Sequence, residues 1–395
     1  MKSKIKAFFA KSGTKSVLSS LICIAAGIFV GWLVLLILAL VSDKIPVSHA
    51  FKGLAIILAG PFASGGGKNV AFVLGDMLFE AAPLMLTGLS VAIAFKTGLF
   101  NIGAPGQYLM GAMTSVIVAL SIPTTPGTAV LVWLLALLAG MVAGMVWGMI
   151  PGFFKAVLGV NEVIVCIMTN WIAANVVSWV FFNQKQFINT AGGKTAYTLP
   201  TTANGVATPK LGLDKVFPGS NIDIGIFIAI AVAIVLFVLL NKTTFGYELK
   251  ACGHNKNAAK YAGMSEKRNI VLSMAIAGGL AALGASLYYL NGGAELAWNT
   301  YSKLPDTGFN GIPVALLASN NPLGVVFSSV FLRFIDKGGY NLAGFTAYNE
   351  YVSDLIIAVI IYFAGFAKLI GELLSRRKKS KAAGNAKQGK EEANK

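Results

Sequence analysis

Residues 129–150 read AVLVWLLALLAGMVAGMVWGMI, and this uninterrupted apolar run decides the fold class. It contains no charged residue, and as a helix it is long enough to cross about 30 Å of hydrocarbon. Gly140, Gly144 and Gly148 recur every four residues, which places them on one helix face where another helix can approach closely. The sequence leaves open whether that neighbour belongs to this chain or to a second one.

The composition of the whole chain agrees with a membrane protein. Of its 395 residues 56% are hydrophobic and only 12% are charged, about half the charged share of a soluble domain. Mean hydropathy is +0.71. Comparable apolar runs lie at about 17–41, 70–95, 105–120, 162–182, 223–240, 269–290 and 350–371. We therefore predict an all-α integral membrane protein with eight full transmembrane helices, the first of them retained rather than cleaved as a signal.

The region 309–335 departs from this pattern. It consists of two apolar half-spans separated by Asn320-Asn321-Pro322. Broken segments are tolerated at membrane depth only where protein or a water-filled path covers the freed backbone groups. We predict a pair of half-spans that enters the membrane and returns to the same side.

Basic residues indicate the orientation. The net charge is +16, and lysines and arginines gather in the first 15 residues, between 242 and 268, and after Ser375. Cytoplasmic flanks of membrane helices carry such an excess, so both termini are predicted to be cytoplasmic. The basic segments have few interleaved aromatic residues, which argues against nucleic-acid binding.

The charge map divides the chain into three parts. Residues 1–16 form a basic cytoplasmic N-terminus, 17–374 a transmembrane domain, and 375–395 a disordered basic cytoplasmic tail. Within the domain, 183–222 is predicted to be an external loop over the outer mouth, and 241–268 a cytoplasmic loop.

No catalytic set can be assembled from the loops. The chain has two histidines and three widely spaced cysteines, with no metal-ligand spacing. Gly192-Gly193-Lys194-Thr195 resembles the end of a phosphate-binding loop but lacks its leading glycine. We expect no cofactor and no enzyme activity, so any ATPase that drives transport must be another chain.

The cytoplasmic loop contains the most informative stretch, FGYELKACGHNKNAAKYAGM at 245–264. Gly253 and Gly263 are predicted to bracket a short helix that Asn255 caps. Small side chains give this helix a smooth face that a partner's groove can accept, namely Ala258, Ala259 and Ala262. The alternative is a solvated basic loop that only holds the orientation.

This stretch resembles the cytoplasmic coupling segment of permease subunits in the branched-chain amino acid, ribose and nucleoside group of bacterial ATP-binding cassette (ABC) importers. Two further blocks are similar to blocks of that family, GLFNIGAPGQYLMGA at 98–112 and GFNGIPVALL at 308–317 with Asn320-Asn321-Pro322 following. The three occur in family order and cover about 70 to 370. The chain departs from the family pattern at Lys250, where arginine is usual, and at Pro105, where the nucleoside branch has an acidic residue.

The resemblance implies a multi-pass permease in the bacterial plasma membrane that moves nucleosides inward by alternating access. It implies a separate cytoplasmic ABC ATPase, a second permease subunit and an extracellular substrate-binding lipoprotein. The residues expected to couple to the ATPase are Gly246, Lys250, Gly253, Asn255, Ala258, Ala259 and Gly263. Ribose-like sugars and branched-chain amino acids remain alternative substrates.

Polar side chains in the broken or glycine-rich segments are candidates for the substrate pathway, because amides both donate and accept hydrogen bonds. The candidates are Asn101, Gln107, Asn170, Trp171, Phe309, Asn310 and Asn320. The alternative is that the amides cap half-helices and that Trp171 packs against a neighbour.

A transporter of another class, coupled to an ion gradient, would need a titratable group at membrane depth, and the candidates are Glu80, Asp76 and Glu162. We expect no Lys, Arg or His within the membrane to partner Glu80, and we expect Glu80 and Asp76 to lie near the interface.

Overall fold

The structure is a computed structural model that describes residues 12–42, 44–63, 69–191, 194–300, 303–348 and 351–366. Helices are the only extended regular elements in these segments, with two isolated β-bridges beside them. The prediction of an all-α membrane protein is thus confirmed. The predicted basic N-terminus, apart from its last residues, and the basic tail 375–395 lie outside the described residues.

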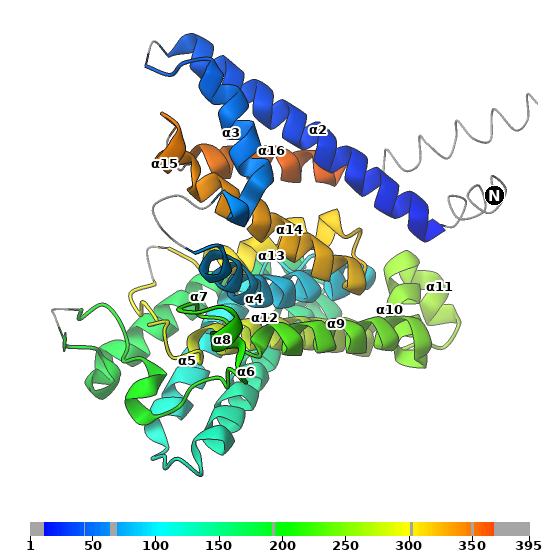
Figure 1. Cartoon of the computed structure of the whole chain (residues 1–395). Coiled ribbons are helices and arrows are strands. Elements are labelled where there is room, and N and C mark those ends of the chain that lie inside the picture. The colour runs from blue at the N-terminus through cyan, green and yellow to red at the C-terminus, as the bar shows by residue number, and fades with distance from the viewer. Residues whose placement is uncertain are drawn as a thin grey trace, which may run out of the picture.

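The bounds of the helices are as follows (Figure 1). The long ones are α2 (Ser12–Val41), α4 (Val70–Lys96), α5 (Ala104–Ser121), α6 (Ala129–Leu158), α7 (Glu162–Asn183), α9 (Gly225–Lys242), α12 (Glu266–Tyr289), α14 (Pro322–Tyr340) and α16 (Tyr351–Gly365). The short ones are α3 (Ser48–Ala59), η1 (Gly60–Phe62), η2 (Lys185–Phe187), η4 (Thr201–Asn204), α8 (Leu213–Val216), α10 (Thr244–His254), α11 (Lys256–Tyr261), α13 (Asp306–Leu317) and α15 (Leu342–Phe345).

Six of the described helices are long and apolar enough to cross a membrane, or seven spans if the bent pair α13–α14 counts as one. The six are α2 from Ile22 onward, α4, α6, α7, α9 and α12. Helix α5 falls short because its first turns hold Gln107 and Tyr108, and only 15 residues of α16 are described. The predicted number of eight full crossings is therefore not confirmed.

The predicted break in the late half-spans is confirmed. The chain bends by 120° between helix α13 and helix α14. Ser319 and Asn320 adopt positive φ values of 51° and 56°, and Asn321 caps α14 by accepting a hydrogen bond from Leu323 N at 3.0 Å. Pro322 then occupies the first turn of α14, where its missing N–H costs nothing.

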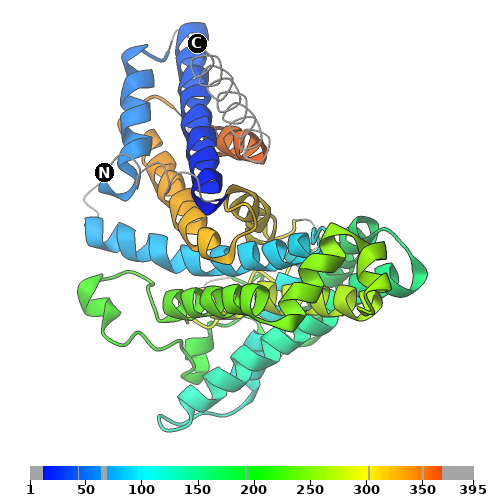
Figure 2. The same cartoon turned by 90° about the vertical axis from the view of Figure 1, so that its right-hand side faces the viewer.

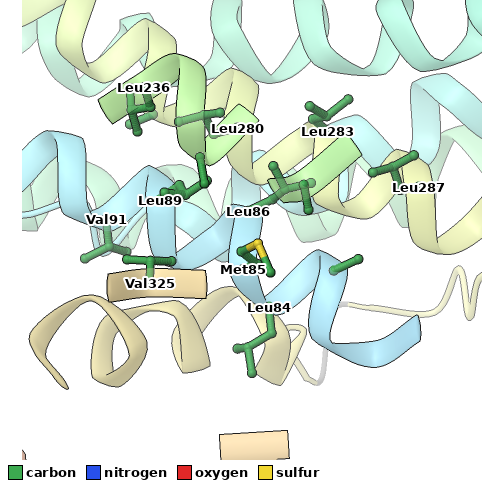
Figure 3. Packing of buried hydrophobic residues seen from close by; sticks show 14 of the residues in the cluster. Leu84, Met85, Leu86, Leu89, Val91, Leu236, Leu280, Leu283, Leu287 and Val325 are labelled. Carbon is green, nitrogen blue, oxygen red and sulfur yellow. The ribbon is translucent and has the colours of Figure 1, made fainter. Parts of the chain in front are cut away.

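Helices α4 and α12 form the centre of the molecule, and each has 83% of its most apolar window buried. Leucines of both helices interlock with α9 and α14 through Leu86, Leu89, Leu236, Leu280 and Val325 (Figure 3). In Figure 2, α14 and α2 lie on one side of α4, and α9 and α6 lie on the other. The two central helices therefore contact most of the other spans.

The glycine face of α6 packs against α12 of the same chain, which answers the question that the sequence left open. A Cβ on Gly144 would collide with Ala282 and lie 2.5 Å from Gly278 O, and one on Gly148 would lie 3.0 Å from Gly278 Cα. In lipid the hydrophobic effect does not drive helices together, so membrane helices associate through close van der Waals packing of this kind. The two helices form the tightest pair in the core.

A second group of helices surrounds the outer side of α14. Helices α2, α3, α15 and α16 share a smaller apolar core with Ile335 of α14, and Tyr348 Oη donates to Leu35 O at 2.7 Å. Helix α3 was not predicted from the sequence, because its 12 residues are too few to stand out as a span.

The predicted loop 183–222 is folded onto the ends of the long helices. Asn204 Nδ2 donates to Ala119 O at 2.7 Å and to Ile122 O at 2.8 Å at the end of α5. Trp133 Nε1 of α6 donates to Thr208 Oγ1 at 3.0 Å. The loop therefore covers this end of the bundle rather than extending away from it.

A buried carboxyl fixes the end of this loop. Asp223 is 3% exposed, and it accepts hydrogen bonds from Asn291 Nδ2 at 2.5 Å and Gly225 N at 2.7 Å. Burial raises the pKa of Asp223 from 3.8 to about 6 despite these donors.

Because its pKa is higher in the folded than in the unfolded state, Asp223 binds a proton more tightly when the protein is folded. Its contribution to stability is thus largest below about pH 4 and declines as the pH rises to about 6. We expect the melting temperature of Asp223→Asn in detergent to vary less with pH than that of the wild type over this window. An equal pH dependence in both proteins would assign the effect to other groups.

Candidate functional site

The segment predicted to couple to an ATPase is helical, as the sequence indicated. Asn255 Oδ1 accepts from Ala258 N at 3.1 Å and caps α11, and Gly263 follows this helix with φ +82°. One helix was predicted here, but a second helix, α10, precedes it. Thr243 caps α10, because its Oγ1 accepts a hydrogen bond from Gly246 N at 3.1 Å. Two short helices thus replace the single one.

Helix α10 is fixed to the ends of both central helices. A Cβ on Gly253 would lie 2.9 Å from Gly98 N and from Thr97 C, at the end of α4. Asn269 Nδ2 of α12 donates to Glu248 Oε2 of α10 at 3.0 Å. Thr97 Oγ1 and Ser273 Oγ, 2.7 Å apart, join α4 to α12 at the same level. A displacement of α10 would therefore reach both central helices directly.

The exposed side of this segment is aromatic and basic. Tyr261 is 94% exposed and Tyr247 63% exposed, and a groove of about 800 Å³ runs between the end of α9, α10 and the start of α12. Lys250 Nζ lies 3.4 Å from Asn241 Oδ1 beside this groove. Of the predicted smooth face, Ala258 and Ala262 are exposed, whereas Ala259 is buried.

The amide candidates from the first half of the chain form one buried network. Asn101 Nδ2 donates to Gln107 Oε1 at 2.8 Å and to Ser90 Oγ at 3.0 Å, and Gln107 Nε2 donates back to Asn101 Oδ1 at 3.1 Å. Asn170 accepts from Gly106 N at 2.8 Å and donates to Ile102 O at 2.9 Å. These bonds hold the turn between α4 and α5, which agrees with the capping interpretation.

The other candidates lie elsewhere. Trp171 is 43% exposed on the outer face of α7, in a shallow apolar groove with Trp179, and it does not face Asn170's network. Asn320 lies in the α13–α14 turn, where its buried Oδ1 has no hydrogen-bond partner among the described residues. A pathway role for these residues and for the buried amides stays a prediction.

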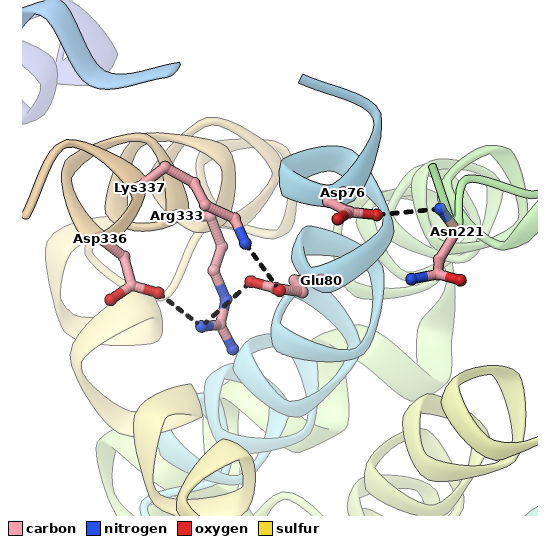
Figure 4. Close-up of polar contacts among 6 residues, drawn as sticks. All are labelled: Asp76, Glu80, Asn221, Arg333, Asp336 and Lys337. Carbon is pink, nitrogen blue, oxygen red and sulfur yellow. Dashed lines mark hydrogen bonds and ion pairs between the residues drawn. The ribbon is translucent and has the colours of Figure 1, made fainter. Parts of the chain in front are cut away.

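Glu80 has basic partners, contrary to the sequence-based expectation. Lys337 Nζ donates to Glu80 Oε1 at 2.8 Å, and Arg333 Nη1 lies 3.8 Å from Glu80 Oε2 and 2.9 Å from Asp336 Oδ2 (Figure 4). This ion-pair cluster (Glu80, Arg333, Asp336, Lys337) was not predicted, because Arg333 lies near the end of the predicted half-span 309–335 and Lys337 follows it. Two basic residues four positions apart on one helix face were the available signal.

The cluster borders a polar cleft between α4, α13, α14 and α16, with a volume of about 400 Å³. Two predicted pathway residues, Phe309 and Asn310, line it together with Asp306, Arg333, Asp336 and Asp354. Leu84, Pro313, Leu332, Ile357 and Ala358 supply apolar wall. The structure thus places Phe309 and Asn310 at one opening, and Asn101, Gln107 and Asn170 around a closed turn.

Asp76, one turn before Glu80, has a different partner. Its carboxylate accepts a hydrogen bond from Asn221 N at 2.9 Å (Figure 4). It therefore ties α4 to the covering loop.

Comparison with known proteins shows the family to which the chain belongs. A model of the family described as "Branched-chain amino acid transport system / permease component" matches residues 73–365. No solved structure matches the chain.

Several named permease proteins align with most of the chain. It is 33% identical over 331 residues to the nucleoside ABC transporter permease protein NupB of Lactococcus lactis, covering 84% of this chain and 88% of the relative. It is 34% identical over 311 residues to the guanosine ABC transporter permease protein NupP of Bacillus subtilis, covering 79% and 86%. The guanosine ABC transporter permease protein NupQ of the same organism is 25% identical over 271 residues, covering 67% and 81%.

The family match spans the central helices, the α10–α11 segment and the broken pair, the parts in which the sequence blocks and the geometry agree. The chain therefore belongs to the family of branched-chain amino acid transport system permease components and is a multi-pass membrane permease subunit.

Proposed function

We propose that this chain is the transmembrane permease subunit of an ATP-driven importer that takes up nucleosides. Its similarity to NupB and NupP over most of its length supports the substrate class. The seating of α10 on the ends of α4 and α12 supports the mechanism, because it joins an exposed segment to the two most buried spans. This contact is the single observation that carries the proposal.

In this mechanism a cytoplasmic ABC ATPase binds α10 and α11 and moves them when it takes up and hydrolyses ATP. The residues proposed to transmit the motion are Gly246, Lys250, Gly253, Asn255, Ala258, Ala259 and Gly263. Gly253 contacts the end of α4, whereas the exposed Tyr261 faces the space where the ATPase would bind. The motion opens the permease alternately to the two sides of the membrane.

We propose the topology that was expected from the sequence, with eight full crossings and a pair α13–α14 that returns to the side from which it enters. In this topology both termini, the 241–268 loop and the basic 375–395 tail lie in the cytoplasm. The covering loop 183–222 then lies outside, where an extracellular lipoprotein delivers the solute. The domain is thus 17–374, in the bacterial plasma membrane.

A second permease subunit completes the proposed channel. Two permeases of one organism, NupP and NupQ, are both similar to this chain and bear the same guanosine transporter name. We therefore favour a heterodimer. Ribose-like sugars and branched-chain amino acids are the substrates against which the nucleoside proposal is tested.

The test is uptake into proteoliposomes that contain this chain, its ATPase, the second permease and the lipoprotein. We expect uptake of uridine or guanosine to require ATP on the side of the membrane where the ATPase is bound. This uptake should exceed the uptake of ribose and of leucine at equal concentration. Uptake that persists without ATP and collapses with an ionophore would instead indicate an ion-coupled transporter. Transport of leucine or ribose without transport of nucleosides would contradict the assignment of nucleosides as the substrate.

A further inference from the structure

The polar cleft differs from the buried amide network in being open. Asn310 and Asp306 are exposed in it and Phe309 is half-buried, whereas Asn101 and Gln107 have almost no accessible surface. Its volume of about 400 Å³ falls in the range of about 300–1,000 Å³ common for small-molecule sites. The cleft therefore has room for a small solute.

Six charged side chains in or beside the cleft form ion pairs with one another. Lys303 Nζ lies 2.9 Å from Asp306 Oδ2, Arg333 pairs with Asp336, and Lys337 pairs with Glu80 (Figure 4). A charged solute would have to displace one of these partners and leave an unpaired charge in a partly buried site. The arrangement favours a neutral ligand over an amino-acid zwitterion.

Two side chains in the cleft still have unused hydrogen-bonding groups. The Asn310 amide makes no hydrogen bond with any residue in the described part of the chain. Arg333 uses Nη1 for both of its ion pairs, and its Nη2 donates to no described residue. An amide that donates and accepts, beside a planar guanidinium that donates, can satisfy the ring nitrogen and carbonyl groups along one edge of a nucleobase.

The remaining lining supplies a flat apolar contact. The Phe309 ring lies one residue before Asn310 on α13, and Leu84 and Pro313 extend the apolar wall. Aromatic rings bind bases by stacking with little dependence on base identity. A nucleobase offers a larger flat apolar face to this wall than a simple sugar does.

From these features we propose that the polar cleft is a nucleoside-binding subsite of the permease itself. The base stacks on Phe309 with its edge toward Asn310 and Arg333, and the sugar hydroxyls lie toward the carboxylates of Asp306 and Asp354. This inference deepens the proposed function and depends on it. The ion-pair cluster positions Arg333 and does not itself contact the sugar.

Photolabelling locates the subsite directly. The complete transporter is illuminated with 8-azidoadenosine during turnover, and labelled peptides are identified by mass spectrometry. We expect adducts within α13 or α14, and we expect excess unlabelled adenosine, but not ribose or leucine, to abolish them. Adenosine-sensitive adducts confined to other helices would overturn the subsite.

Two variants test the assigned side chains. Asn310→Ala removes a side chain with no internal bond, and Phe309→Leu removes the ring but keeps apolar volume. We expect each to lower nucleoside uptake about tenfold, while calorimetry shows unchanged nucleoside binding by the lipoprotein. Phe309→Tyr, which keeps the ring, should restore most of the uptake.

Phe327→Leu is the matched control, because Phe327 is 76% exposed on α14 and does not line the cleft. It should transport like the wild type. If the wild type takes up nucleosides and the two cleft variants do so equally well, the subsite is wrong although the proposed function stands. If the wild type takes up no nucleoside, the proposed function fails first.

Discussion

Gly253→Val is expected to abolish uptake while the protein still assembles. The atoms that a side chain would meet are backbone atoms of Thr97 and Gly98, which cannot rotate away as a flexible side chain could. Valine must therefore push the end of α10 off the end of α4. The ATPase would then move α10 without moving the central helix, so ATP hydrolysis continues without transport.

The measurement is nucleoside uptake and ATP hydrolysis in the same proteoliposomes. We expect uptake below about a tenth of wild type, and hydrolysis that no longer rises when loaded lipoprotein is added. Gly127→Val is the control, because no atom lies within 4 Å of the Cβ position of Gly127. Normal uptake by Gly253→Val would remove α10 from the coupling mechanism.

Gly144→Leu should prevent the helical core from forming. Its side chain would enter the space held by Ala282 and the backbone at Gly278, in the closest helix pair of the molecule. Overpacking of a well-packed core costs about 1–3 kcal/mol and more where backbone blocks relaxation. The variant should therefore lose most of its monodisperse fraction after detergent extraction, as judged by size-exclusion chromatography.

A matched pair separates packing from helix propensity. Val146→Leu makes a similar side chain on the same helix, at a position that is 57% exposed, and should behave like the wild type. The milder Gly144→Ala should lower the melting temperature, and adding Ala282→Gly should recover part of the loss. Lack of any recovery would mean that Ala282 is not the partner that limits the approach.

Much of the fold could be predicted because lipid imposes a simple rule on sequence. A helix that crosses the bilayer must be apolar over about 20 residues, so α6 or α9 is visible without any partner. The break before Pro322 and the cap at Asn255 were visible for a similar reason, since each depends on neighbours along the chain.

Features that depend on distant residues could not be predicted in this way. Glu80 and Lys337 are bonded although 257 positions separate them, and nothing local to Glu80 indicates a cation. The amides of Asn101 and Gln107 illustrate the same limit, because polarity alone does not distinguish a group that faces a passage from one that holds a turn. Helix α3 was not predicted because its 12 residues are fewer than a transmembrane helix needs.

The pairing of α6 with α12 also bears on how the chain is made. Helix α6 leaves the ribosome more than 100 residues before α12, so its face at Gly144 and Gly148 lacks its partner until residues 266–289 have been made. A nascent chain halted after α9 would hold a grooved α6 and a central α4 without their main partner. Such fragments should be short-lived substrates of membrane proteases, and a pulse-chase of chains truncated before and after Tyr289 would show the half-life increase once α12 is present.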